Sequence, residues 1–218
     1  MSEASWTVVV PIKRLDAAKS RLRGAVADVP HDRLALALAL DTVAAVVTCE
    51  PVAEVLVVTA DPTVATAVRG LGAAVVPDPP AGGLNAAFRA GAAAAADGAW
   101  IAALTADLPA LRPAELADAL RTAQADPRLR RFVADAGATG TVLLTAPPGV
   151  PLDPRFGAGS ADAHVRSGAV PLLGEWPTLR RDVDTAADLA EAAKAGLGRH
   201  TAALLGPRWS PQGGGVPC

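Results

Sequence analysis

Short apolar runs alternate with alanine- and leucine-rich segments along the chain, and this alternation predicts an α/β protein. Apolar runs rich in β-branched residues and bounded by proline, glycine or polar residues indicate buried strands, whereas longer alanine-rich stretches indicate helices. Such an order favours a three-layer, mostly parallel sheet with right-handed crossovers. We expect strands at 6–10, 55–59, 74–76, 100–104, 132–135, 141–145 and 170–173, and helices at 17–22, 30–47, 63–71, 84–96, from Pro113 onward, from a cap at Ser160 to 167, and 185–195.

The length of the chain suits a single domain. With 218 residues and 51% hydrophobic content, it can bury a substantial core without disulfides or structural metals. We place the domain at residues 1–206. Residues 207–218 are rich in proline and glycine, and we expect them to form a disordered tail.

Charge and composition exclude several classes of partner. The formal net charge is −2, and the chain has three Phe, four Trp and no basic stripe, which argues against nucleic acid as the main partner. Cys49 and Cys218 form neither a disulfide framework nor a zinc motif, which fits a reducing cytoplasm. The apolar run at 34–40 is interrupted by Asp41, and no export signal precedes it. We therefore expect a cytoplasmic protein that acts on a small ligand.

A basic loop follows the first predicted strand. The chain has only three lysines, and two of them, Lys13 and Lys19, lie in this loop before a helix for which Asp16 is a candidate N-cap. The carboxyl end of a strand followed by a helix N-terminus favours phosphate binding, and compact ammonium groups suit polyphosphate. A merely solvated basic surface is the alternative.

Three aspartates stand at element boundaries. Asp107 follows the strand 100–104, and Asp182 and Asp184 flank Val183 just before a helix. Carboxylates of this kind suit Mg²⁺, which completes its shell with water and substrate phosphate. The alternative is an ordinary helix entrance, since Thr185-Ala186-Ala187-Asp188 has the spacing of a capping box with Asp in place of Glu. Together with the basic loop, the aspartates indicate attack on a nucleotide phosphorus, in which the protein supplies position and charge neutralisation.

Two glycine-containing turns complete the candidate site. Residues 137–140 join two short strands, and 155–160 precede a helix; their small residues and exposed N–H groups can hold a phosphate and a carboxylate. The chain has no Ser/His/Asp motif, no G-x-S-x-G and no P-loop sequence. His31, His164 and His200 are scattered, so we interpret them as structural or exposed, although His164 follows the second turn.

Six motifs occur in an order that resembles a known family. They are V-P-I-K-R-L-D-A-A-K-S-R-L, G-G-L-N-A-A, L-T-A-D-L-P, G-A-T-G-T, R-F-G-A-G-S and R-D-V-D-T. The chain resembles, to about Gly198, the 2-phospho-L-lactate or phosphoenolpyruvate guanylyltransferases of deazaflavin coenzyme biosynthesis. The resemblance implies a three-layer, Rossmann-like nucleotidyltransferase fold related to the molybdenum-cofactor guanylyltransferases.

The resemblance also implies roles for individual residues. Lys13 and Lys19 would lie in the GTP phosphate loop, and Leu84 and Asn85 near the nucleotide. Asp107, Asp182 and Asp184 would bind Mg²⁺, with Asp107 and the two lysines as the catalytic residues. The phosphorylated acid would lie at Thr141, Gly157 and Ser160.

The implied reaction transfers GMP from GTP to the phosphate of a small acid and releases pyrophosphate. The resemblance leans to the bacterial branch, which favours phosphoenolpyruvate over 2-phospho-L-lactate. It leaves a homodimer open and implies a downstream transferase that consumes the product.

Alternatives of two classes stay open. One is another nucleotidyltransferase that uses CTP or a different acceptor; the other is a non-catalytic sensor that binds nucleotide. The broader superfamily has a glycine-rich A-A-G-x-x-x-R-M loop where this chain has P-I-K-R-L-D-A-A-K, which disfavours a sugar-nucleotide or molybdenum-cofactor enzyme.

Overall fold

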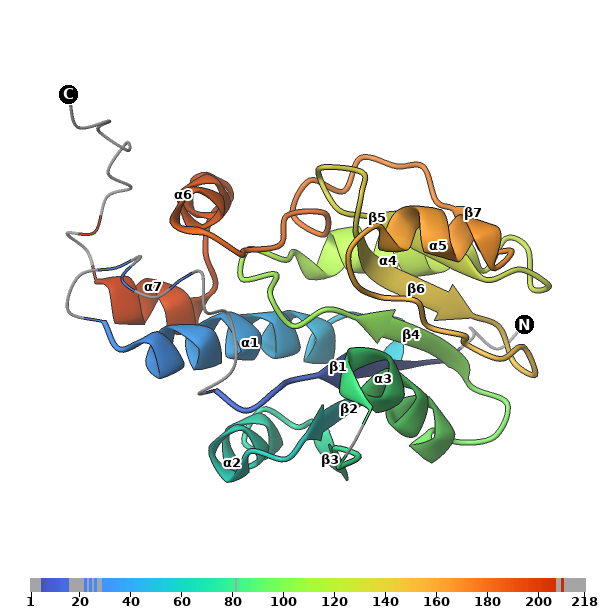
Figure 1. Cartoon of the computed structure of the whole chain (residues 1–218), viewed down its shortest axis with the longest axis horizontal. Coiled ribbons are helices and arrows are strands. Elements are labelled where there is room, and N and C mark those ends of the chain that lie inside the picture. The colour runs from blue at the N-terminus through green and yellow to red at the C-terminus, as the bar shows by residue number, and fades with distance from the viewer. Residues whose placement is uncertain are drawn as a thin grey trace.

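A seven-stranded sheet forms the centre of the molecule (Figure 1). The structure is a computed structural model that describes residues 5–15, 22, 24, 26, 29–80, 82–206 and 209. The strand order is β3-β2-β1-β4-β6-β5-β7, and only β6 runs opposite to the others. The predicted, mostly parallel sheet is therefore confirmed. The strands are β1 Trp6–Pro11, β2 Val52–Thr59, β3 Ala74–Pro77, β4 Trp100–Leu104, β5 Arg131–Ala134, β6 Thr141–Ala146 and β7 Val170–Pro171.

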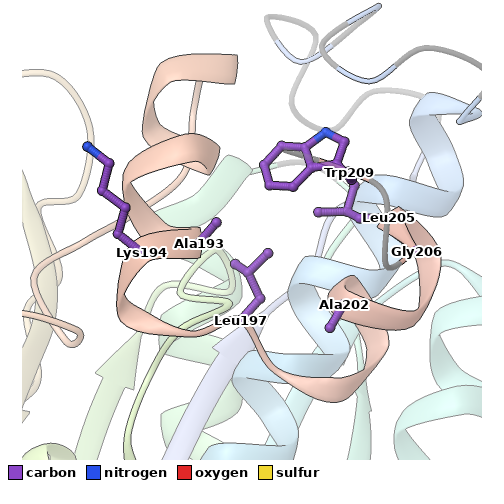
Figure 2. A pocket seen from close by; sticks show the side chains of 7 residues that line it. All are labelled: Ala193, Lys194, Leu197, Ala202, Leu205, Gly206 and Trp209. Carbon is purple, nitrogen blue, oxygen red and sulfur yellow. The ribbon is translucent and has the colours of Figure 1, made fainter. Parts of the chain in front are cut away.

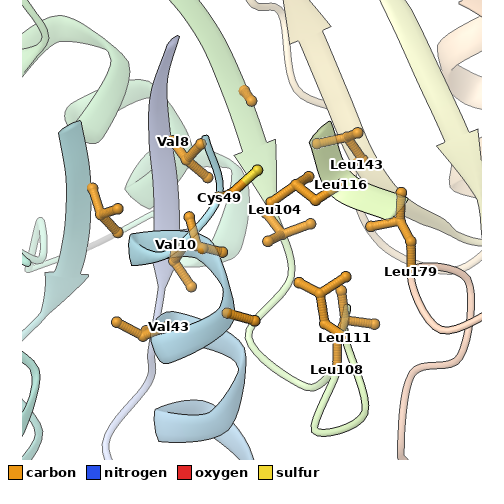
Figure 3. Packing of buried hydrophobic residues seen from close by; sticks show 14 of the residues in the cluster. Val8, Val10, Val43, Cys49, Leu104, Leu108, Leu111, Leu116, Leu143 and Leu179 are labelled. Carbon is orange, nitrogen blue, oxygen red and sulfur yellow. The ribbon is translucent and has the colours of Figure 1, made fainter. Parts of the chain in front are cut away.

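Helices cover both faces of the sheet, which makes three layers. Buried side chains of α1, α2 and α4 pack on one face, and those of α3 and α5 pack on the other. Figure 3 shows the first of these cores, where Val8 and Val10 of β1 meet Val43 of α1, while Leu104 and Leu116 join from β4 and α4. The helices are α1 His31–Val47, α2 Pro62–Arg69, α3 Gly83–Ala94, α4 Pro113–Ala123, α5 Ser160–Arg166, α6 Ala186–Ala195 and α7 Arg199–Leu205.

Strand β1 is apolar except for Thr7, whose hydroxyl donates to Glu54, and it is buried on both faces. Val8 and Val10 belong to the core under α1 and α4, whereas Val9 belongs to the core under α3. Parallel strands covered by helices on both sides have this composition. The strand includes Pro11, so it runs one residue further than predicted.

Strand β6 enters the sheet between two strands that run the other way. Its register pairs Leu143 with Leu104 of β4 and with Val133 of β5. The start of β6 therefore lies at the same edge of the sheet as the carboxyl ends of β4 and β5. The 135–140 turn that joins β5 to β6 lies at that edge.

Some element boundaries differ from those predicted. Strand β2 begins at Val52 rather than 55, and β7 ends at Pro171 rather than 173. Ser160 is the first residue of α5 rather than its cap; the cap is Gly159, whose φ of 67° is easy for glycine. The predicted helix at 17–22, the cap Asp16 and the expected disorder of the tail lie outside the described residues, apart from Leu22 and Trp209.

Helix α7 was not predicted, because its signals come from elsewhere in the chain. The carboxylate of buried Asp41, in α1, accepts hydrogen bonds from the N–H groups of His200 and Thr201, each at 2.8 Å. Gly198 lies so close to Asp41 that a Cβ would collide with the carboxylate. Asp41 thus caps a short helix some 160 residues later. Among the described residues, no helix is both long and apolar enough to cross a membrane.

We predict that Gly91→Ala destabilises the protein although alanine is the better helix former. A Cβ on Gly91 would collide with Cγ1 of Val9 and lie 3.0 Å from Cγ2 of Val58. Helix propensity would stabilise by up to about 1 kcal/mol, whereas overpacking typically costs about 1–3 kcal/mol. Urea unfolding should show a lower midpoint. The control Ala93→Ser, on the exposed face of α3, should leave the midpoint nearly unchanged; an unchanged midpoint for Gly91→Ala would contradict the tight approach of α3 to the sheet.

Candidate functional site

The basic loop after β1 and the loop after β4, which contains Asp107, leave the sheet side by side. Val9 of β1 pairs in parallel with Ala103 of β4, so the segments after the two strands emerge at one edge. Lys13 lies two residues beyond β1 with an exposed side chain, and Asp107 lies three residues beyond β4. Lys19 lies outside the described residues.

Asp61 fixes the described part of the basic loop. Its Oδ2 accepts the N–H of Leu15 at 3.2 Å, while its Oδ1 accepts the N–H groups of Thr63 and Val64 and caps α2. Burial by itself would raise the pKa of Asp61, but these donors and the charge of Arg14 outweigh it and lower the pKa below its usual value. The carboxylate therefore stays ionised and holds the loop to the carboxyl end of β2.

A main-chain hydrogen bond brings together the loop that contains Asp107 and the acidic segment, residues 182–184. The N–H of Val183 donates to the carbonyl oxygen of Asp107 at 3.0 Å, and the Val183 side chain is fully buried. Asp182 and Asp184 therefore flank a residue that is anchored beside Asp107. The capping box that follows is confirmed, with the Thr185 side chain accepting from the N–H of Asp188 and the Asp188 carboxylate accepting from the N–H of Thr185.

The three aspartates do not form a ready-made metal cluster. Within the described parts of the chain, no three or more His, Cys, Asp or Glu side chains lie close enough to hold a metal together. Magnesium is commonly held by one or two carboxylates, with water and substrate phosphates completing the shell. The main-chain contact of Val183 brings the segments that contain Asp107, Asp182 and Asp184 together, and one or two of their carboxylates would suit an ion that substrate phosphate helps to bind.

Hydrogen bonds join the two glycine-containing turns to the acidic segment. Asp135 closes the first turn by accepting the N–H groups of Thr139 and Gly140, and the carbonyl oxygen of Thr139 accepts the N–H of Ala161 in α5. Arg180 donates from Nε to the carbonyl oxygen of Ala134 at 3.1 Å and from Nη2 to that of Asp135 at 3.0 Å. The segment that contains Asp182 and Asp184 is therefore tied to the first turn.

The residues assigned to the phosphorylated acid lie around this junction. The Thr141 hydroxyl is buried and lies 2.9 Å from Nδ1 of His164, and the Nε2 of His164 accepts the N–H of Arg155 at 3.0 Å. Gly157 is exposed with a φ of 136°, and its carbonyl oxygen accepts the N–H of buried Ser160 at 3.1 Å. One histidine thus connects the start of β6 to the second turn.

Asn85 has a structural role that its sequence motif did not indicate. Its Nδ2 donates to the carbonyl oxygen of Phe156 at 2.9 Å, and its Oδ1 accepts the N–H of Phe156 at 2.8 Å. The amide therefore clamps the first turn of α3 to the 155–160 turn. Leu84, beside it, packs partly buried against the core under α3, so both residues lie next to the turn assigned to the acid. Contact with nucleotide stays a prediction for both.

We predict that burial of His164 makes the stability of the protein fall in acid. Burial, followed by the charge of Arg130, lowers the pKa of His164 to about 4. The unfolded chain, with a His pKa of about 6.5, binds a proton that the folded chain excludes between about pH 4 and 6.5. The free energy of unfolding therefore rises with pH across this window. The contribution of His164 makes it about 2 kcal/mol lower near pH 5 than near pH 7.

The measurement is urea unfolding near pH 5 and near pH 7 for the wild type and His164→Gln, which cannot titrate there. Carboxylates contribute equally to both proteins, so the variant should show the smaller loss on acidification. Equal losses would contradict the assignment of a neutral, buried ring.

Four positioning residues, namely Asp61, Asp135, Arg180 and His164, were not predicted from sequence. Asp61 and Arg180 bind main-chain groups 45 or 46 residues away, and no local motif marks such contacts. Asp135 instead accepts from Thr139 and Gly140 within its own turn, and His164 accepts from the main chain of Arg155, nine residues before it. His164 gave the only hint, because it follows the second turn by a few residues.

A separate apolar cavity of about 670 Å³ lies between α6 and α7. Figure 2 shows Leu197, Leu205 and Trp209 around it, with Lys194 at its rim. None of the predicted site residues lines it, and it lacks the convergent polar groups of a site for a charged substrate. The cavity therefore does not belong to the candidate site.

Comparison with known proteins identifies the same fold and chemistry. Residues 23–200 match the model of the MobA-like NTP transferase domain. The phosphoenolpyruvate guanylyltransferase of Salinispora arenicola is 68% identical over 201 residues, which are 92% of this chain and 94% of that protein. That of Geodermatophilus obscurus is 55% identical over 96% of this chain and 98% of its own length.

Solved structures support the fold at much lower identity. A nucleotidyl transferase from Methanothermobacter thermautotroptrophicus superposes with a TM-score of 0.62 at 20% identity, covering 89% of this chain and 98% of that one. The 4-diphosphocytidyl-2C-methyl-D-erythritol synthase of Anaerococcus prevotii gives a TM-score of 0.53 at 9% identity, covering 88% and 96%. The predicted nucleotidyltransferase fold is confirmed.

Proposed function

Because this chain belongs to the phosphoenolpyruvate guanylyltransferases and carries a MobA-like NTP transferase domain, we propose that it transfers GMP from GTP to the phosphate of phosphoenolpyruvate. A phosphate oxygen of the acid attacks the α-phosphorus of GTP, and the bond from that phosphorus to the β-phosphate oxygen breaks. Pyrophosphate leaves, and the product is a diphosphate that joins GMP to the acid. The names of the relatives favour this acceptor over 2-phospho-L-lactate and over the substrates of other nucleotidyltransferases.

The observation that carries this proposal is the hydrogen bond between Val183 and Asp107. It joins the main chain beside Asp182 and Asp184 to that of Asp107, in the loop that leaves β4 at the edge of the sheet where Lys13 follows β1. Opposite charges at one edge suit a nucleotide whose phosphates lie between ammonium groups and a bound cation. In this proposal Lys13, together with Lys19, neutralises the charge that develops on the leaving pyrophosphate.

The aspartates would hold a divalent cation, which we take to be Mg²⁺. When bound, such an ion neutralises phosphate charge and aligns the attacking and leaving oxygens. The residues of this chain do the rest: Asp61 holds the basic loop, and Arg180 holds the acidic segment against the first turn. The main chain near Gly157 and Ser160 would receive the acid.

The wider setting follows from the same proposal. The product contains an activated diphosphate, so a downstream transferase would consume it, and the sequence resemblance points to deazaflavin coenzyme biosynthesis. A homodimer and a cytoplasmic location are further parts of the proposal, which gel filtration and cell fractionation would test.

The direct experiment incubates the purified protein with GTP, Mg²⁺ and one acid at a time. Pyrophosphate release and product mass are measured with phosphoenolpyruvate, with 2-phospho-L-lactate and with no acid. We expect release with phosphoenolpyruvate only, and replacing GTP by CTP should abolish it. Release with 2-phospho-L-lactate alone would overturn the choice of acceptor, and no release with either acid would overturn the function.

A further inference from the structure

The two nitrogens of His164 contact two different segments of the acid site. Nδ1 lies 2.9 Å from Oγ1 of Thr141 at the start of β6, and Nε2 lies 3.0 Å from the main-chain nitrogen of Arg155 before the 155–160 turn. Both contacts are buried or partly buried. A single side chain thus joins the start of β6 to the second turn.

The contact with Arg155 determines the tautomer of the ring. A main-chain N–H can only donate, so Nε2 must accept and carries no proton. In a neutral ring the proton then lies on Nδ1, which donates to Oγ1 of Thr141, and the ring also contacts the main chain of Ser160. Because the Thr141 oxygen accepts this bond, its own hydroxyl proton is directed elsewhere and can be donated to a further group.

Aromatic side chains hold the ring in this orientation. The edge of His164 meets Phe156 with ring centroids 5.2 Å apart, and Phe132 lies at 5.7 Å. Phe156 in turn stacks on Phe88 of α3 at 4.3 Å. The His164 side chain is fully buried, so neither water nor a change of rotamer competes for its two hydrogen bonds.

We propose that His164 is the positioning residue of the acid site, because it turns the Thr141 hydroxyl into a hydrogen-bond donor toward the phosphorylated acid and fixes the main chain that enters the Gly157–Ser160 turn. This inference rests on the proposed function, which places the acid at Thr141, Gly157 and Ser160. A neutral ring is required for it, and the lowered pKa of His164 keeps the ring neutral at ordinary pH.

Three substitutions separate the two contacts. His164→Asn keeps an N–H donor near the position of Nδ1, His164→Gln keeps an acceptor near the position of Nε2, and His164→Leu removes both. We expect the KM for phosphoenolpyruvate to rise about tenfold for His164→Gln and further for His164→Leu, while the KM for GTP stays within about twofold. His164→Asn should recover part of the loss.

A double-mutant cycle tests whether the ring acts through Thr141. Thr141→Val should raise the KM for phosphoenolpyruvate about as much as His164→Gln does, and the double variant should be no worse than either within about twofold. The matched control is His200→Gln, because the His200 ring accepts from its neighbour Arg199 on α7, away from Thr141 and the 155–160 turn.

The outcomes distinguish this inference from the proposed function. A purely structural role would reduce the folded fraction, which lowers the apparent kcat and leaves both KM values unchanged; that result, or additive effects in the cycle, would overturn the assignment. A wild type that releases no pyrophosphate with either acid would instead overturn the function on which the assignment rests.

Discussion

Asp107→Asn and Asp184→Asn should each lower kcat about a thousandfold while the protein stays folded. A bound divalent cation would stabilise the charge that develops on the transferring phosphoryl group by several kcal/mol, and these carboxylates would hold that cation; each 1.4 kcal/mol corresponds to about tenfold in rate. Asn has nearly the same shape as Asp but lacks the charge. The Val183–Asp107 contact uses main-chain atoms, which the substitutions leave in place.

The measurement is pyrophosphate release at saturating GTP and phosphoenolpyruvate, with urea unfolding to establish the fold. Asp97→Asn is the matched control, because Asp97 is exposed in the turn before β4, away from the site. EDTA should stop the wild type, and added Mg²⁺ should restore it. Near-normal turnover of either variant, or of the metal-stripped protein, would show that these aspartates do not serve the chemistry.

Lys13→Ala should raise the KM for GTP or lower kcat by about ten- to a hundredfold. A charge-assisted hydrogen bond to phosphate contributes about 1.5–3 kcal/mol, and a small apolar side chain cannot replace it. The Lys13 side chain is exposed just beyond β1, so its removal should change the kinetics without destabilising the fold. Lys19→Ala should behave in the same way, an expectation that depends on the sequence alone.

Lys194→Ala is the control for this experiment. Lys194 pairs with Glu191 at 2.7 Å on the exposed side of α6, and surface pairs of this kind contribute little. Its kinetics should match those of the wild type. If all three lysine variants behave alike, the basic loop is a solvated surface and the phosphate assignment fails.

Most strands were predictable because the local sequence contains their cause. Strand β4 has the predicted bounds, since Trp100–Leu104 is an apolar run between a turn and a polar loop. Helix α1 was equally clear from its alanine and leucine content. Helix α7 could not be found, because its cap is a carboxylate in α1 and its start depends on a glycine beside that carboxylate.

The sequence indicated where the charged candidate residues lie, although their roles stay predictions, and it did not indicate the contacts that support them. Asp107 and the Asp182–Asp184 pair stand at element boundaries, which sequence patterns reveal. Asn85 lies in a motif of the family resemblance, yet its amide is engaged with the main chain of Phe156. Whether a polar side chain faces a ligand or another loop depends on tertiary contacts, and no spacing in the sequence encodes them.

The reversed direction of β6 gives the two sides of the proposed site different connections. This difference affects how easily the preference for a new acid could evolve. The loops that we propose to bind the nucleotide precede crossover helices, so changing their length would move a whole helix. The 135–140 hairpin turn, which we propose to lie on the acid side, joins neighbouring strands without any helix between them. Such turns tolerate insertion and replacement while the scaffold stays fixed. In the proposed arrangement, the turn on the acid side can therefore be replaced while the loops on the nucleotide side stay in place.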